Sequence, residues 1–134
     1  MKSKAYIPAS VFLAIALAMH YAGVHWNLYT IITWYDDPLH FISGLGIGLA
    51  FYWIFNEFNI LGGLHGKHVW AIVGFVLAAA AAWECFEAFY DLAGYPIGSV
   101  AYLVDTAKDI INGVVGSIAA LVIIKEVFEK NKNQ

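Results

Sequence analysis

Four apolar segments, each long enough to cross a lipid bilayer, limit what this chain can fold into. They cover residues 6–26, 38–58, 69–90 and 105–128. A helix of about 20 residues spans the roughly 30 Å of a hydrocarbon core. Charged residues make up only 13% of the sequence, whereas a soluble domain carries roughly 25%. We therefore predict an all-α, polytopic membrane protein, with a single four-helix transmembrane domain over residues 1–134.

The first segment allows a second interpretation, a cleaved signal peptide. Lys2 and Lys4 precede its apolar stretch, and the Ala-Leu-Ala at 16–18 resembles a cleavage site. The apolar run continues beyond that point, however, and this favours a membrane span.

The lysines predict the orientation of the spans. Six of the seven lie near the two termini or in the 57–68 loop, whereas loops 27–37 and 91–104 contain none. The positive-inside rule places lysine-rich loops in the cytoplasm. We therefore expect a multi-pass protein of the inner or plasma membrane, with both termini cytoplasmic. Seven of the ten acidic residues then fall in the outer half, where Lys108 is the one lysine.

The second segment carries polar residues on one helical face. Asp37, His40, Gly44 and Gly48 recur at helical spacing. Glycines allow a neighbouring helix to approach closely, so we expect this face to be packed in the interior of the bundle. Asp36 or Asp37 is also suited to cap a helix whose first turn holds a proline. Capping would account for one of the two aspartates and leave the other unexplained.

The third segment carries acids at a depth where a bilayer disfavours charge. Glu84 and Glu87 share a helical face, and Glu84 lies roughly 10 Å below the outer end of the segment. Ionisable residues at such depths mark functional sites by default. The structural alternatives are a hydrogen-bonded pair of protonated carboxyls and an outer vestibule that water reaches.

The fourth segment opens with a similar stripe. Asp105, Asp109 and Asn112 fall on one face, and Gly116 continues it. Lys108 lies beside them and can neutralise one neighbouring acid.

These stripes meet at the outer ends of the segments, because the second and fourth begin there and the third ends there. A bundle that encloses so many acids must protonate some, pair them or bind a cation. Histidines with carboxylates suit Zn²⁺, Mn²⁺ or Fe²⁺, and oxygen ligands alone suit Mg²⁺ or Ca²⁺, although the spacing matches no strong metal signature. The candidate ligands of a divalent metal ion are Asp37, His40, Glu84, Glu87, Asp105 and Asp109, with His20 as a weaker one.

The two outer connections differ in character. Residues 27–35 are rich in aromatic side chains and too short to span, so we expect an aromatic surface segment at the interface. Residues 92–104 are long and apolar for an exposed connection, and we expect a lid or a re-entrant segment there.

Three short motifs resemble those of known families. They are D-x-x-H-F-x-x-G, a W-E pair, and D-T-x-x-D with a later N and G, carried by Asp37, His40, Phe41, Gly44, Trp83, Glu84, Asp105, Thr106, Asp109, Asn112 and Gly116. Over residues 36–120 their order resembles the YjdF-like bacterial inner-membrane proteins and is similar to the VanZ-like proteins. The chain departs from the VanZ-like pattern where Asp36-Asp37 replaces D-K and where no Q or R follows Glu84. The resemblance implies a small polytopic protein and supports the site without naming an activity.

Two classes of function fit these residues. The first is an outward-facing, metal-assisted hydrolase or transferase that acts on a lipid or envelope intermediate. In that enzyme the candidate catalytic residues are His40, Glu84 and Asp109, and the candidate substrate-binding residues are Asn112 and Lys108.

The second class is a non-enzymatic module that binds or transports a cation or relays protons. A structural membrane subunit with an internal polar network is a third alternative. The bilayer is a partner in every case, a lipid or lipid-linked ligand suits the first class, and the glycine-bearing face also suits a homo-oligomer. A net charge of -3 without any arginine argues against nucleic acid.

Overall fold

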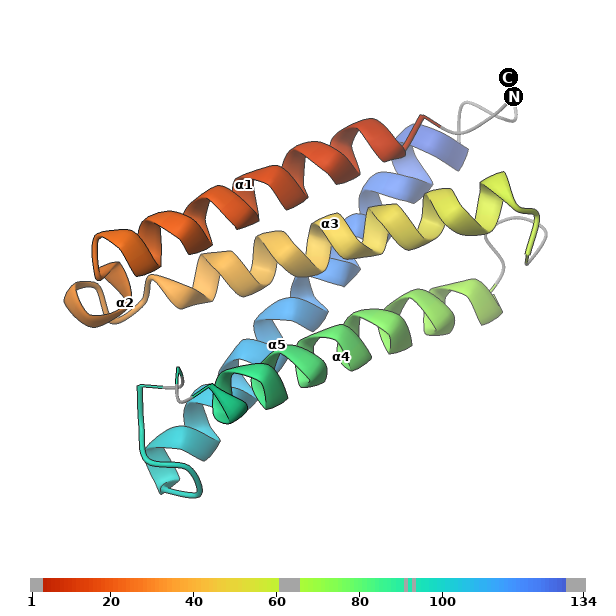
Figure 1. The fold of residues 1–134 in the computed structure, drawn as a ribbon. Coiled ribbons are helices and arrows are strands. Elements are labelled where there is room, and N and C mark those ends of the chain that lie inside the picture. Colours follow the sequence, from red (N-terminus) through yellow and green to blue (C-terminus); the bar gives the residue numbers. More distant parts are fainter. Residues whose placement is uncertain (1–3, 61–65, 91, 93, 130–134) are drawn as a thin grey trace.

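The computed structural model describes residues 4–60, 66–90, 92 and 94–129, and every regular element within these ranges is helical (Figure 1). The elements are α1 (Tyr6–His25), α2 (Leu28–Ile31), α3 (Asp36–Glu57), α4 (Gly66–Phe89), α5 (Val100–Ile123) and a π-helical continuation of α5, η1 (Ile124–Glu129). Four of these helices are long and apolar enough to cross a membrane. The prediction of an all-α protein with four spans is confirmed.

Three helix starts differ from the predictions. The α4 helix begins at Gly66 rather than at residue 69. The α3 helix begins at Asp36, with Tyr35 at the N-cap position and no side-chain hydrogen bond there, so neither aspartate caps the helix. The α5 helix begins at Val100, because the Ser99 hydroxyl oxygen accepts a hydrogen bond from the backbone N–H of Tyr102 at 3.2 Å. Residues 100–104, expected in a lid or re-entrant segment, are therefore the start of α5.

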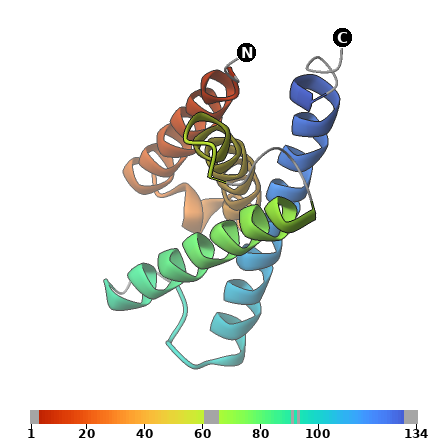
Figure 2. The ribbon, with the colours of Figure 1, turned by 90° about the vertical axis from the view of Figure 1, so that its right-hand side faces the viewer.

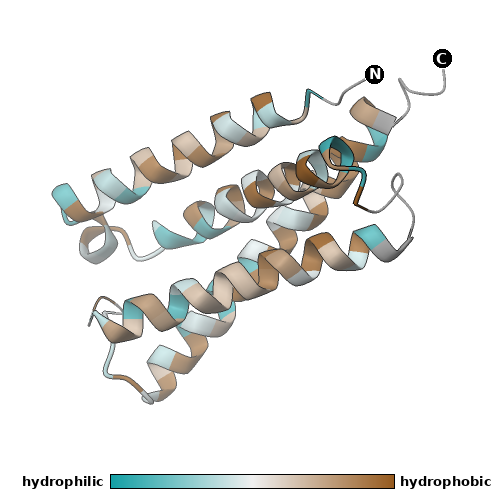
Figure 3. Cartoon of the chain, turned by 45° about the vertical axis from the view of Figure 1, so that its right-hand side comes forward, coloured by the Kyte–Doolittle hydropathy of each residue, from teal (hydrophilic) through white to brown (hydrophobic). Residues whose placement is uncertain are grey.

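The four long helices are coloured mainly as hydrophobic along their bodies, with hydrophilic residues mostly near their ends (Figure 3). The start of α1 and the end of η1 lie at the same end of the bundle as the end of α3 (Figure 1). We call this the terminal end, and the opposite end, where α2 lies and α3 begins, the site end. The assignment of the terminal end to the cytoplasm remains a prediction from the lysines.

The closest approach between helices is that of α3 and α5, and it depends on glycine. A Cβ atom added to Gly44 would overlap the carbonyl oxygen of Gly113, and one added to Gly116 would overlap the carbonyl oxygen of Phe41. Such close backbone contact lets dispersion forces hold two helices together where lipid supplies no hydrophobic driving force. Gly44 is buried, as expected for the packed face of its helix.

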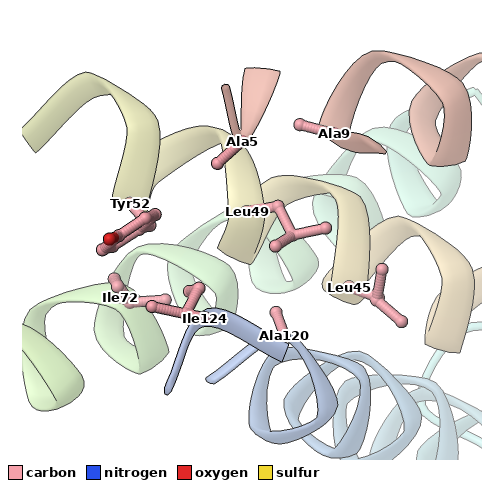
Figure 4. Close-up of a cluster of buried hydrophobic side chains, with 8 residues drawn as sticks. All are labelled: Ala5, Ala9, Leu45, Leu49, Tyr52, Ile72, Ala120 and Ile124. Carbon is pink, nitrogen blue, oxygen red and sulfur yellow. The ribbon is translucent and has the colours of Figure 1, made fainter. Parts of the chain in front are cut away.

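A cluster of buried apolar side chains lies between the helices on the side of the terminal end (Figure 4). This cluster, which we call the inner core, consists of Ala5, Ala9, Leu45, Leu49, Tyr52, Ile72, Ala120 and Ile124. All four long helices or their extensions contribute to it. The polar residues of the predicted site lie toward the other end of the same helices.

Candidate metal centre

Three side chains at the site end bring potential ligand atoms together. Asp36 and His40 lie one turn apart on α3, and Asp109 lies on α5, which the glycine contact holds against α3. One ligand atom from each residue lies within 4.8 Å of the other two. The Nε2 atom of His40 is 3.3 Å from Oδ1 of Asp36, close enough for electrostatic attraction although the geometry is not that of a hydrogen bond.

Each of these three residues has a buried polar atom that makes no hydrogen bond. His40 is 5% exposed and Asp109 only 1%. Within the described residues, Asp36 Oδ1, His40 Nε2 and Asp109 Oδ1 have no hydrogen-bond partner. Buried polar atoms in proteins are almost always paired, and leaving one unpaired costs about 1–3 kcal/mol. A bound cation would satisfy all three atoms at once.

Glu84 approaches the same cluster from α4. It is 6% exposed, and its Oε1 atom also lacks a partner in the described part of the chain. Thr106 of α5 lies beside it, and Glu84 is close enough to His40 and Asp36 to interact with them electrostatically. It is not one of the three mutually close ligands. Glu84 therefore lies beside the Asp36–His40–Asp109 group, and one of its carboxylate oxygens makes no hydrogen bond.

Asp37 and Asp105 are engaged elsewhere, in an ion-pair network around Lys108. The Lys108 ammonium lies 3.1 Å from Asp37 and 3.0 Å from Asp105. Asn112 also donates a hydrogen bond to Asp37, at 3.0 Å. This network links α3 to α5 beside the buried group. Two of the predicted metal ligands and both predicted substrate-binding residues therefore contact one another in this structure.

Glu87 and His20 lie on the α1–α4 side and are linked through one indole ring. The Trp83 N–H donates a hydrogen bond to Glu87 at 2.7 Å. The ring of His20 packs edge-on against Trp83, with their centroids 5.1 Å apart. The partner that a buried imidazole needs is Tyr29, whose hydroxyl lies 2.8 Å from Nδ1 of His20. Neither Glu87 nor His20 joins the three mutually close ligands.

The aromatic segment before α3 is anchored to α1 rather than lying wholly on the surface. Tyr29 is half-buried, and burial, with the charge of Asp36 as a lesser cause, raises the pKa of its hydroxyl above the usual range. Tyr35 donates a hydrogen bond to the carbonyl of Met19 at 2.8 Å. Trp34 and Ile31 of the same segment are exposed, as expected for an interfacial stretch.

Sequence reasoning missed Asp36 as a member of the cluster. It grouped Asp37 with His40 at i, i+3 and assigned one aspartate to capping. The structure instead places Asp36 against His40 at i, i+4, and Asp37 against α5. The i, i+4 spacing of a carboxylate and an imidazole was the signal that could have identified Asp36.

The fold and the cluster define a polytopic helical membrane protein with a buried carboxylate–histidine group. A family model described as "Predicted membrane protein (DUF2238)" matches residues 4–130, and the chain belongs to this family. No curated protein matches the chain, and no solved structure does. The family description agrees with the predicted class of protein, and the finer YjdF-like and VanZ-like resemblance rests on the motifs alone.

Proposed function

We propose that this chain is a metal-dependent membrane enzyme, a hydrolase or transferase that acts on a lipid or envelope intermediate at the outer face. The observation that carries the proposal is that Asp36, His40 and Asp109 offer ligand atoms within 4.8 Å of one another, and that each of them has a buried polar atom without a hydrogen bond. Three protein ligands leave coordination positions open, as catalytic metal sites require. The motif resemblance to YjdF-like and VanZ-like proteins supports the same region.

The mixed donor set favours a transition metal. One imidazole with two carboxylates suits Zn²⁺, Mn²⁺ or Fe²⁺ better than Mg²⁺ or Ca²⁺, which prefer oxygen ligands alone. When bound, such an ion polarises a carbonyl or phosphoryl oxygen or lowers the pKa of a water molecule. In this proposal Asp36, His40 and Asp109 hold the ion. Its placement at one end of the spans gives access to the polar head of a membrane lipid.

The chain's own residues would perform the remaining tasks. Glu84 has a buried carboxylate oxygen without a partner beside the ligands, so it is placed to accept and return a proton. Thr106 of α5 lies beside this carboxylate. Lys108 lies at the more exposed edge and can attract an anionic head group, while Asn112 fixes Asp37 and with it the register of α3 against α5.

A cation transporter is the alternative from the second class. Transport requires polar groups or water along the full path across the membrane. Below the proposed metal centre, the buried described residues are mainly apolar, including Leu45, Leu49 and Ala120. The hydroxyl of the buried Ser117 donates its hydrogen bond within its own helix, to the carbonyl of Val114. This apolar packing favours a centre that works at one side of the membrane.

The test is a metal analysis of the purified full-length protein in lipid nanodiscs. Wild type, His40→Ala and Asp109→Asn are each loaded with Zn²⁺ or Mn²⁺, desalted and analysed by elemental mass spectrometry. The matched control is His25→Ala, since His25 is exposed and its ring lies against those of Tyr21 and Trp26 at the end of α1. Circular dichroism and gel filtration verify that each variant is folded.

We expect a stoichiometric metal in wild type and His25→Ala and its loss in both site variants. A folded wild type without metal, or equal metal in all four proteins, would overturn the metal centre. The enzymatic part is tested by incubating the loaded protein with a bacterial lipid extract and comparing lipid products with those of His40→Ala. Bound metal with identical product profiles would contradict the enzyme and favour a cation-binding module.

A further inference from the structure

An elongated cavity extends from the candidate metal centre toward the middle of the bundle. Its volume is about 240 Å³, and His40 lies on its wall. The lining residues of α1, α3 and α4 run from His20, His40 and Trp83 over two helical turns toward the terminal end. Two turns correspond to roughly 11 Å along the helix axis. The cavity therefore connects the buried ligands with the depth at which lipid chains lie.

The cavity is a groove between α1 and α4, with α3 as its floor. The α1 helix packs on α3, and α4 packs on α5 and α3, whereas α1 and α4 are less closely packed in the described residues and meet at the site end through the rings of His20 and Trp83. Figures 1 and 2 show α1 and α4 as separate helices on either side of α3. Leu17 lines the groove and is nevertheless 70% exposed. One edge of the groove thus reaches the outer surface of the bundle, which in a membrane faces lipid.

The walls of the groove are apolar below its upper end. Leu13 and Leu17 of α1, Ile47 of α3, and Val76 and Ala79 of α4 line it. Apolar cavities of this kind stay dry, so water is a poor occupant. On its open side, the groove faces the hydrocarbon chains of the lipid bilayer.

We propose that the groove between α1 and α4 binds a hydrocarbon chain of the lipid substrate and directs its head group to Asp36, His40 and Asp109. This inference rests on the proposed function for the role of the head group. The shared position of His40, in both the ligand cluster and the groove wall, supports it. Tail and head would then contact consecutive parts of one continuous surface.

The groove and the metal centre would contribute differently to lipid binding. A chain that moves from the bilayer into an apolar groove exchanges one hydrocarbon environment for another, so there is little hydrophobic gain. The head group therefore supplies the affinity, and the groove supplies position and the selection of chain shape. Chain occupancy should accordingly not require the metal, and this separates its test from that of the metal centre.

The test uses Trp83, which lines the groove, as a fluorescent reporter. In a single-tryptophan variant, Trp26, Trp34, Trp53 and Trp70 are replaced by Phe. The protein is placed in nanodiscs of phosphatidylcholine brominated midway along its acyl chains, in the presence of a chelator. Bromine quenches indole fluorescence only at close range. A second variant that retains only Trp70, which is 75% exposed, reports the quenching produced by surrounding lipid.

The groove is then filled by Ala79→Phe or by the smaller Ala79→Leu. The matched control is Ala81→Phe, because Ala81 is an exposed alanine of the same helix and is not among the lining residues. We expect Trp83 to be quenched, the quenching to fall in both Ala79 variants, and no change in Ala81→Phe.

Unquenched Trp83, or equal quenching in the Ala79 and Ala81 variants, would overturn the groove proposal whatever the metal analysis finds. Quenching that depends on Ala79 in a protein that binds no metal would keep the lipid groove and refute the metal centre. If the Trp70 reporter also lost its quenching in Ala79→Phe, a general change in the fold would explain the result and the proposal would fail.

Discussion

Gly116→Ala tests the contact on which both the bundle and the candidate metal centre depend. The added methyl group would overlap the carbonyl oxygen of Phe41 and lie 2.9 Å from the backbone nitrogen of Leu45. Ordinary van der Waals contact begins near 3.4 Å. Because the obstructing atoms are backbone on α3, they cannot rotate away as a side chain can. The two helices must move apart, by on the order of 1 Å.

The expected loss of stability follows from this geometry. Overpacking a well-packed interior typically costs about 1–3 kcal/mol, and a backbone-to-backbone obstruction places Gly116→Ala at about 3 kcal/mol. Separation of α3 from α5 also withdraws Asp109 from His40. We therefore expect metal affinity to fall together with stability, although Gly116 itself offers no ligand.

Gly74→Ala is the matched control, since Gly74 lies in α4 and no described atom would lie within 4 Å of the added methyl. This substitution should be neutral or stabilise the helix by up to about 1 kcal/mol, the difference in helix propensity between the two residues. Both variants are unfolded in mixed micelles of increasing sodium dodecyl sulfate, and helicity is followed by circular dichroism. Equal midpoints for Gly116→Ala and wild type would refute the close-contact argument, as would equal destabilisation by both substitutions.

Two further changes test the network and the aromatic anchor beside the cluster. Lys108→Met removes the cation between Asp37 and Asp105. The substitution should destabilise the protein by about 1 kcal/mol yet raise metal affinity on the order of tenfold by removing a neighbouring positive charge. Lys125→Met is the control, and a fall in Zn²⁺ affinity measured by isothermal titration calorimetry would contradict the reasoning. Tyr29→Phe should remove a phenol that keeps its proton at alkaline pH, because burial raises its pKa. The unfolded chain releases this proton with a pKa of about 10, whereas the folded protein keeps it to higher pH. The stabilisation is therefore complete below about pH 10 and is lost as the pH rises above it. Wild type should therefore lose stability above that pH more steeply than Tyr29→Phe, and parallel pH profiles of unfolding would count against the buried phenol.

The four spans and their polar stripes could be predicted from the sequence, because hydropathy and helical spacing are local properties. The roles of Asp36 and Asp37 could not. Adjacent residues on a helix point about 100° apart, and both aspartates lie near the face that carries His40. Which one turns toward His40 depends on the rotation of α3 about its axis. That rotation is set by the backbone contacts between the two helices, of Gly44 with Gly113 and of Phe41 with Gly116, which are long-range in sequence.

The start of α5 shows a different reason for a wrong prediction. Residues 100–104 follow a proline and two glycines, a composition that predicts part of a long loop. The hydroxyl of Ser99, however, caps the helix at that point, and a serine ahead of an apolar run is a recognised start signal. In a membrane protein, loop and helix are both apolar near the interface, so composition alone did not separate them.

The order of the helices along the chain has a consequence for biogenesis. The α1 and α3 helices can pair as soon as both have entered the membrane, but the closest partner of α3 is α5, the last helix to be synthesised. Until α5 arrives, Asp36 and His40 have neither Asp109 nor the Lys108 network beside them. A chain that stops short of its fourth span therefore presents two unmatched polar side chains to the bilayer, a state that membrane quality control can recognise. Completion of the cluster and completion of the fold are one event.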